Sequence, residues 1–214
     1  MERFEALLSG SGGQGMILAG IVLAEAAVRQ GLNAVQSQSY GPEARGGASK
    51  SEVIVSSGEI DFPRVTRPRV VLCMSPQAFE RYGRTAPPGA LVVVDSSQVG
   101  DTGGGGGGCD SRLVRVPITA LARERAGRAV AANMVAVGLI SGLSGVLERG
   151  AVLEAMRRHV PRATQEANER ALQAGLEVAE SVAAGAAEGV AVGGARGAVA
   201  VTAAGRDGSG ARQG

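Results

Sequence analysis

Two glycine-rich stretches near the N-terminus carry the residues best suited to binding chemistry. The first, at residues 9–15, matches G-x-G-x-x-G through Gly10, Gly12 and Gly15, with Gly13 as a fourth glycine. Glycines at this spacing permit a tight turn and let an anion approach the N-terminus of the helix that follows. These four glycines are therefore candidate binding residues.

The second stretch, Ser-Tyr-Gly-Pro-Glu-Ala-Arg-Gly-Gly at residues 39–47, places one aromatic and two opposite charges among turn formers. Its proline restricts the backbone, whereas its last two glycines permit positive φ. A guanidinium on such a loop can hold a phosphate or carboxylate through two hydrogen bonds. Alternatively, Arg45 pairs with Glu43 or with a partner subunit, or the stretch is a solvated turn. The candidate ligand- or interface-binding residues here are Tyr40, Gly41, Glu43, Arg45, Gly46 and Gly47.

The remaining polar residues form no recognisable catalytic set. The only histidine, His159, lies near a predicted helix end, where a capping or surface role is the simplest interpretation. Asp95 ends a predicted strand, as either an active-site residue or a cap. Cys73 and Cys109 form no CxxC pair that could hold zinc or an iron–sulfur cluster. We expect no catalytic residue and no metal ligand in this chain, so any chemistry belongs to a partner or a cofactor.

The glycine motif alone leaves two further interpretations open. A dinucleotide-binding motif requires an acidic residue about 20 positions later, to bind the ribose. Residues 33–38, Asn-Ala-Val-Gln-Ser-Gln, contain none, which counts against NAD or FAD. A tight turn that binds nothing is the other interpretation.

Apolar runs and helical periodicity predict the elements that position these residues. A strand at 4–8, the glycine stretch, a helix ending near Gly31 and a strand at 33–38 form a βαβ unit, which predicts a parallel sheet with a right-handed crossover. Strands or hairpin arms follow at 49–56, 70–74, 91–95 and 113–116, and Ser75 with Pro76 predicts the start of a short helix. From Thr119 the pattern is helical, with apolar stripes that include Val135 and Leu139 and, further on, Leu172. We therefore expect an α/β fold with an open, mostly parallel, Rossmann-like sheet and a helical C-terminal region.

Composition sets the domain organisation and excludes several classes of protein. We expect one domain over residues 1–182 and a disordered, low-complexity tail over 183–214, with the glycine run at 103–108 as a flexible insertion. The net charge of +2, without a long basic run, does not suggest nucleic acid as a partner. Residues 129–147 are uncharged, but modest hydrophobicity favours a buried helix over a membrane span. With no signal peptide pattern, a reduced, cytoplasmic protein is expected.

The two glycine stretches, in this order and at this distance, resemble the gamma subunit of 2-oxoacid:ferredoxin oxidoreductases. The resemblance covers about residues 4–180. Residues 36–47 look most like the 2-oxoglutarate branch of that family. Further matching segments are residues 48–55, 60–63, 70–78, 88–95, Asn133, 138–139 and 166–169. The glycine run and the tail look unlike the family core.

This resemblance implies a complex that oxidatively decarboxylates a 2-oxoacid to an acyl-CoA and passes electrons to ferredoxin. Thiamine diphosphate, coenzyme A and an iron–sulfur cluster would serve the complex, with none of them bound by this chain alone. The implied partners are alpha and beta subunits, ferredoxin and, as a further candidate, a ferredoxin-like delta subunit. A stand-alone nucleotide- or flavin-binding oxidoreductase and a pure assembly module are the alternatives.

Overall fold

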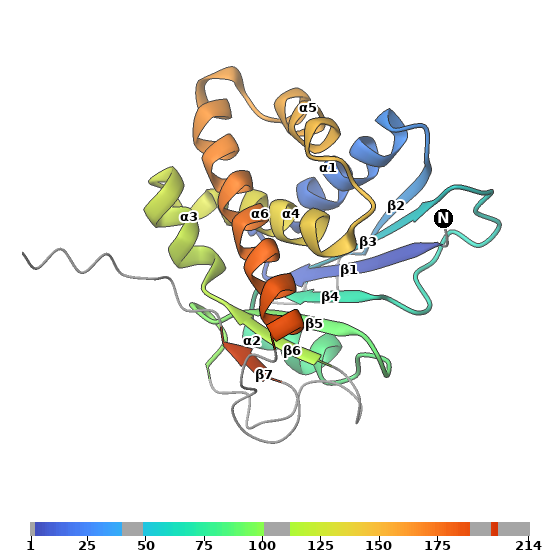
Figure 1. Cartoon of the computed structure of the whole chain (residues 1–214), viewed down its shortest axis with the longest axis horizontal. Coiled ribbons are helices and arrows are strands. Elements are labelled where there is room, and N and C mark those ends of the chain that lie inside the picture. The colour runs from blue at the N-terminus through green and yellow to red at the C-terminus, as the bar shows by residue number, and fades with distance from the viewer. Residues whose placement is uncertain (1–2, 40–48, 101–111, 189–197, 201–214) are drawn as a thin grey trace, which may run out of the picture.

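A seven-stranded mixed sheet forms the centre of the molecule in the computed structural model, which describes residues 3–39, 49–100, 112–188 and 198–200 (Figure 1). The strand order is β2-β3-β1-β4-β5-β6-β7. β1, β4, β5, β6 and β7 are parallel, whereas β3 is antiparallel to both of its neighbours. The strands are β1 (Phe4–Gly10), β2 (Asn33–Ser39), β3 (Ser49–Ser56), β4 (Val70–Cys73), β5 (Leu91–Asp95), β6 (Arg112–Val116) and β7 (Ala198–Ala200).

Helices cover both faces of the sheet unequally. Five long helices form a layer on one face, while α2 and the π-helical turn η1 cover the other (Figure 1). Ser75 accepts a hydrogen bond from the Ala78 N–H at 3.2 Å, and Pro76 occupies the first turn of α2, as predicted. The helices are α1 (Met16–Arg29), α2 (Pro76–Ala78), η1 (Phe79–Gly83), α3 (Ile118–Ala126), η2 (Ala129–Ala131), α4 (Ala132–Ser144), α5 (Arg149–His159), η3 (Arg162–Thr164) and α6 (Gln165–Glu188).

β1, α1 and β2 follow one another as predicted, and β2 runs in the same direction as β1. The two strands are not neighbours, because β3 lies between them and pairs antiparallel with both, which the βαβ pattern did not specify. β3 carries the buried residues Val53, Ile54 and Val55, whereas no residue of β2 is fully buried. The more apolar strand therefore takes the interior position and leaves the polar one at the edge of the sheet.

α4 and α6 cross with their backbones in direct contact. A Cβ atom on Gly138 would lie 2.0 Å from the Leu172 carbonyl oxygen, and one on Gly175 would lie 2.0 Å from the Val135 carbonyl oxygen. Real Cβ atoms do not approach other atoms this closely, so both positions require glycine. Around the crossing lie the apolar side chains of both helices, including Val135, Leu139 and Leu172, which are buried as their helical spacing predicted.

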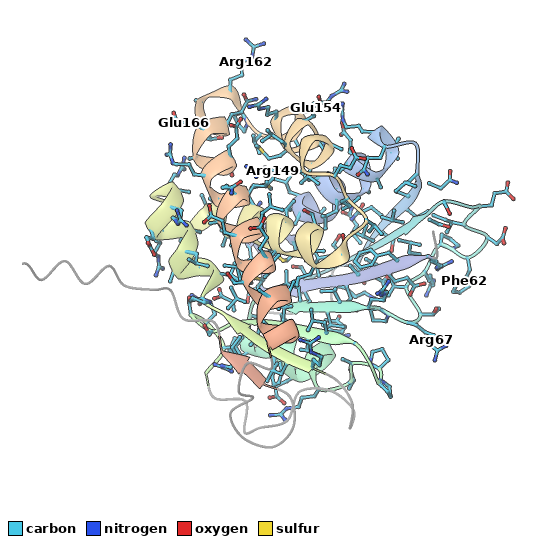
Figure 2. The ribbon with its side chains drawn as sticks, viewed as in Figure 1. Phe62, Arg67, Arg149, Glu154, Arg162 and Glu166 are labelled. Atoms are coloured by element: carbon cyan, nitrogen blue, oxygen red, sulfur yellow. The ribbon has the colours of Figure 1, made fainter. Side chains whose placement is uncertain are left out.

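The connection between β3 and β4, residues 57–69, is held by two charged residues at the start of β1. The buried Glu5 carboxylate accepts hydrogen bonds from the N–H groups of Thr66 and Arg67, each at 2.7 Å. Arg3 pairs with Glu5 and donates to two carbonyl oxygens of the connection. Figure 2 shows Phe62 and Arg67 extending from this connection, and Phe62 is 54% exposed.

The last helix extends further than predicted, whereas the uncharged segment at 129–147 is largely a buried helix, as predicted. α6 continues to Glu188, beyond the predicted boundary at 182, and β7 pairs with β6. Residues 189–197 and 201–214 lie outside the described residues, as does the glycine run at 103–108. Most of the uncharged segment forms η2 and the buried α4. Among the described residues, no helix is long and apolar enough to cross a membrane.

Candidate functional site

The sheet brings the attachment points of both glycine stretches together. Gly10, the last residue of β1, pairs with Ser49, the first residue of β3, and Ser39 at the end of β2 pairs with Lys50. The Ser49 hydroxyl also donates to the Gly10 carbonyl oxygen at 3.1 Å. We call this region, made by Gly10–Gly15, Ser39 and Ser49, the glycine end of the sheet. The other residues predicted in the second stretch, Tyr40, Gly41, Glu43, Arg45, Gly46 and Gly47, lie outside the described residues.

The four glycines of the first stretch differ in the space around a Cβ atom and in their backbone φ angle. A Cβ on Gly10 would meet the Gln14 side chain at 2.4 Å, and one on Gly15 would meet the Asn133 amide at 2.6 Å. Gly13 and Gly15 also have positive φ, at 86° and 72°. At Gly12, by contrast, no described atom lies within 4 Å of the position that a Cβ would take, and the residue is exposed. Packing within the described chain therefore explains Gly10 and Gly15, and positive φ explains Gly13, but neither explains Gly12.

Gln14 fixes the glycine turn, a role that the sequence pattern did not reveal. Its Oε1 accepts a hydrogen bond from the Ser11 N–H at 2.7 Å, and its Nε2 donates to the Met74 carbonyl oxygen at 2.9 Å. The side chain thus joins the ends of β1 and β4. The only available signal was a polar residue with a long side chain inside a run of glycines.

The N-terminus of α1 opens onto this turn without a side-chain cap. Its N-cap is Gly15, and its first turn contains no acidic residue. Asn133 at the start of α4 is 7% exposed, and its amide forms no hydrogen bond with another described residue. First-turn N–H groups and a positive helix end favour an anion. The N–H groups of the first α1 turn and the Asn133 amide beside Gly15 are therefore suited to a phosphate or carboxylate.

Asp95 has a structural role. Its carboxylate is fully buried and accepts hydrogen bonds from the Ser97 N–H at 3.0 Å and from both the N–H and the hydroxyl of Thr119. These bonds tie the end of β5 to the first turn of α3. Of the two interpretations left open for Asp95, the capping one is confirmed.

The surroundings of His159 and Cys73 are explained without a catalytic role. His159 lies in the last turn of α5 and contacts the Glu25 carboxylate of α1, so it is a partly exposed residue that joins two helices. Burial raises the pKa of the Cys73 thiol to about 12, which keeps it protonated and unreactive. Within the described ranges, no three His, Cys, Asp or Glu side chains gather as metal ligands. Cys109 lies outside those ranges.

Glu25 gives this helix contact a defined pH dependence. Burial alone would raise the pKa of Glu25, but hydrogen bonds and positive charge from His159 and Arg29 outweigh it and lower the pKa below its usual 4.5. Arg158 lies 3.6 Å away on the same carboxylate. Because the folded-state pKa is depressed, the stabilisation is present above pH 4.5 and is lost as the pH falls through the folded-state value.

We therefore expect Glu25→Gln to destabilise the protein at neutral pH and to make little difference in acid. Urea unfolding of wild type and variant between pH 3 and pH 7, compared with Glu180→Gln as a control on an exposed helix surface, measures this. A stability difference that stays constant across the series would show that the Glu25 ion pairs do not stabilise the fold.

The sequence is similar to known proteins over most of its length. The model of the pyruvate ferredoxin/flavodoxin oxidoreductase family matches residues 5–178. The 2-oxoglutarate synthase subunit KorC of Methanocaldococcus jannaschii is 41% identical over 167 residues, which cover 78% of this chain and 88% of that protein. The ketoisovalerate oxidoreductase subunit VorA of Methanothermobacter thermautotrophicus is 32% identical over 66% of this chain and 29% of its own length.

A solved structure has the same fold over nearly all of its length. The gamma subunit of keto/oxoacid ferredoxin oxidoreductase from Geobacter sulfurreducens superposes with a TM-score of 0.73 at 40% identity. The match covers 83% of this chain and 99% of that one. The predicted fold class, an open and mostly parallel α/β sheet with a helical C-terminal region, is confirmed.

Proposed function

Because the chain belongs to the pyruvate ferredoxin/flavodoxin oxidoreductase family, we propose that it is the gamma subunit of a 2-oxoglutarate:ferredoxin oxidoreductase. The higher identity to a 2-oxoglutarate synthase subunit than to a ketoisovalerate oxidoreductase subunit supports this substrate. The complex converts the 2-oxoacid to an acyl-CoA and passes the electrons to ferredoxin. Alpha and beta subunits, and a ferredoxin-like delta subunit, are its proposed partners in the cytoplasm.

The observation that carries this proposal is an anion-suited end of the sheet, in a chain whose buried Asp95 carboxylate and Cys73 thiol are used structurally. Asp95 caps a helix and Cys73 is held protonated, so neither supplies acid–base or redox chemistry. Among the described residues, no set of His, Cys, Asp and Glu side chains gathers as the ligands of a metal cluster. We assign the iron–sulfur cluster and thiamine diphosphate to the other subunits. Coenzyme A, which carries phosphates, fits the uncapped α1 N-terminus and Asn133.

The contribution of this chain would then be to bind and orient an anionic substrate at the glycine end. N–H groups of the first α1 turn and the Asn133 amide can donate to phosphate or carboxylate oxygens. Gln14 keeps the turn in place through its bonds to β1 and β4. Arg45, on the connection from Ser39 to Ser49, is the proposed cation of the second stretch.

Reconstitution tests the subunit assignment. The purified chain alone should not reduce viologen with 2-oxoglutarate and coenzyme A, whereas the complex should do so only when the chain is present. Copurification of alpha and beta subunits with the tagged chain is expected. Oxidoreductase activity of the isolated chain with a nicotinamide or flavin cofactor would instead support the stand-alone enzyme.

Gly12→Ala separates ligand binding from mere assembly. The variant should melt like wild type, because the substitution meets open space and Gly12 has no left-handed backbone. If the turn contacts a substrate, the KM of the complex for coenzyme A or for the 2-oxoacid should rise roughly five- to tenfold. Steady-state viologen reduction measures both values.

Gly58→Ala is the matched control, because Gly58 is also open but lies beyond the opposite end of β3. Both variants should assemble with the partner subunits. Identical kinetics for the two would contradict substrate binding at the glycine turn. Loss of assembly in Gly12→Ala alone would favour the assembly module, whose glycines only contact partners.

A further inference from the structure

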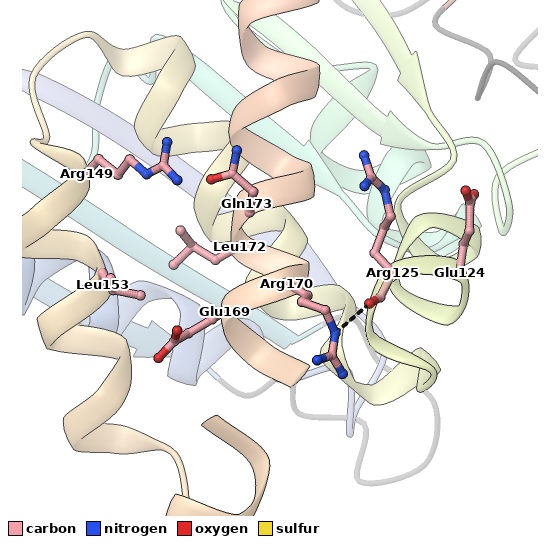
Figure 3. Close-up of a pocket in the computed structure, with 8 residues that line it drawn as sticks. All are labelled: Glu124, Arg125, Arg149, Leu153, Glu169, Arg170, Leu172 and Gln173. Carbon is pink, nitrogen blue, oxygen red and sulfur yellow. Dashed lines mark hydrogen bonds between the residues drawn. The ribbon is translucent and has the colours of Figure 1, made fainter. Parts of the chain in front are cut away.

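A polar cavity lies in the helical layer, apart from the glycine end. It has a volume of about 420 Å³, within the range of small-molecule sites, and lies between α3, α5 and α6. Figure 3 shows Arg149 of α5 and Gln173 of α6 reaching toward the same space, with Leu153 and Leu172 close by. The full lining is Glu124, Arg125, Arg149, Leu153, Glu169, Arg170, Leu172 and Gln173.

Among the described residues, the charges that line this cavity are paired except at Arg149 and Glu124. Arg125 pairs with Glu177, and Arg170 pairs with Glu166 and donates to the Arg125 carbonyl oxygen at 3.0 Å. Glu169 pairs with Arg157 at 2.6 Å. Within the part of the chain that the structure describes, neither the exposed Arg149 nor the exposed Glu124 forms an ion pair or hydrogen bond. The Arg149 guanidinium is therefore available to a ligand.

Arg149 also occupies an unfavourable position on its own helix. It is the first residue of α5, where the helix dipole is positive. The first turn has no acidic residue, and Glu148 at the N-cap forms no capping hydrogen bond through its side chain. A cation at this end is unfavourable unless an anion offsets it. An anion bound beside Arg149 would interact with both the guanidinium and the first turn of α5.

The Gln173 amide indicates a second property of the ligand, a hydrogen-bond donor. Its Nε2 donates to Glu177 Oε1 at 3.1 Å, which fixes the orientation of the amide. Its Oε1 is buried and has no hydrogen-bond partner among the described residues. A buried acceptor without a donor is costly, so a ligand that carries an N–H or O–H group would satisfy it.

From these observations we infer that the α3–α5–α6 cavity binds a small carboxylate with an adjacent N–H donor, the pattern of an α-amino acid. The carboxylate pairs with Arg149, the ammonium donates to Gln173 Oε1, and the side chain lies against Leu153 and Leu172. Glu124 and Glu169 also line the cavity, and their negative charge disfavours a multiply charged phosphate. This site is separate from the glycine end and does not depend on the function proposed there.

Calorimetric titration of the full chain with L-leucine, L-serine and L-glutamate tests the inference without presuming a side chain. At least one should bind saturably. For L-leucine, the deaminated analogue 4-methylpentanoate and the amine 3-methylbutylamine, which lacks the carboxylate, provide matched probes. Each should bind about tenfold or more weakly than the amino acid, because each loses one charged hydrogen bond.

Two variants and one control assign the binding to the cavity. Arg149→Gln should weaken binding of the preferred amino acid about tenfold, and Gln173→Leu should abolish the preference for it over its deaminated analogue. Arg162→Gln, an exposed arginine that points into solvent in Figure 2, should bind like wild type. Absence of saturable binding, unchanged affinity in Arg149→Gln, or tighter binding of inorganic phosphate than of every amino acid would overturn the inference.

Discussion

Gly175→Ala should destabilise the protein by about 3 kcal/mol or more and lower its Tm by roughly 10 °C. The added methyl group would lie 2.0 Å from the Val135 carbonyl oxygen and 2.7 Å from the Leu139 N–H nitrogen. Both are backbone atoms in the middle of α4, so neither can rotate away. The two helices must separate, which opens the most extensively packed helix pair of the core. Denaturant unfolding followed by circular dichroism measures the loss.

Gly150→Ala is the matched control for this substitution. Gly150 lies in α5, and no described atom lies within 4 Å of the position of its added carbon. Alanine is the better helix former, so this variant should gain about 0.5 kcal/mol. Equal stability changes in the two variants would contradict the close crossing of α4 and α6.

Asp95→Ala should cost about 3 kcal/mol, the second-largest effect that we expect. The substitution leaves the buried N–H and hydroxyl groups of Thr119 without their acceptor and removes the bond to the N–H of the exposed Ser97. It also creates a cavity between the end of β5 and the start of α3. Thermal and chemical unfolding measure this change, and viologen reduction by the reconstituted complex measures its effect on activity.

Asp61→Ala is the control, because Asp61 is exposed on the connection between β3 and β4. It should alter the free energy of unfolding by less than about 0.5 kcal/mol. If Asp95→Ala folded as stably as Asp61→Ala and yet inactivated the complex, Asp95 would have a direct part in the reaction instead of a capping role.

Local features of this fold were predictable from the sequence, whereas the contacts between distant segments were not. The apolar run at Leu91–Asp95 predicted β5 with its bounds, and Ser75 with Pro76 predicted the start of α2. Both signals act over a few residues. The insertion of β3 between β1 and β2 depends on which strand buries more apolar surface, which is decided only when the whole sheet assembles.

The same distinction applies to the sites. The glycine spacing at Gly10–Gly15 identified the turn, but the partner of Gly15 is Asn133, which is 118 positions away along the chain. No local pattern around Gly138 and Gly175 indicates the backbone contact between α4 and α6 that requires glycine at both positions. Pairing across such separations is not encoded in any local pattern, and for the same reason the cavity beside Arg149 could not be anticipated.

The hydrogen bonds of Arg3 and Glu5 to residues 57–69 should protect this connection from proteolysis. That connection is exposed and contains Arg64 and Arg69, both of which are cleavage sites for trypsin. A protease must draw several residues of extended chain into its active site, and here the N–H groups of Thr66 and Arg67 are bound to a buried carboxylate. The segment should therefore resist digestion although it has no helix or strand. Removing the first five residues would make it a preferred site of cleavage, so the integrity of the N-terminus protects a part of the chain some sixty positions away.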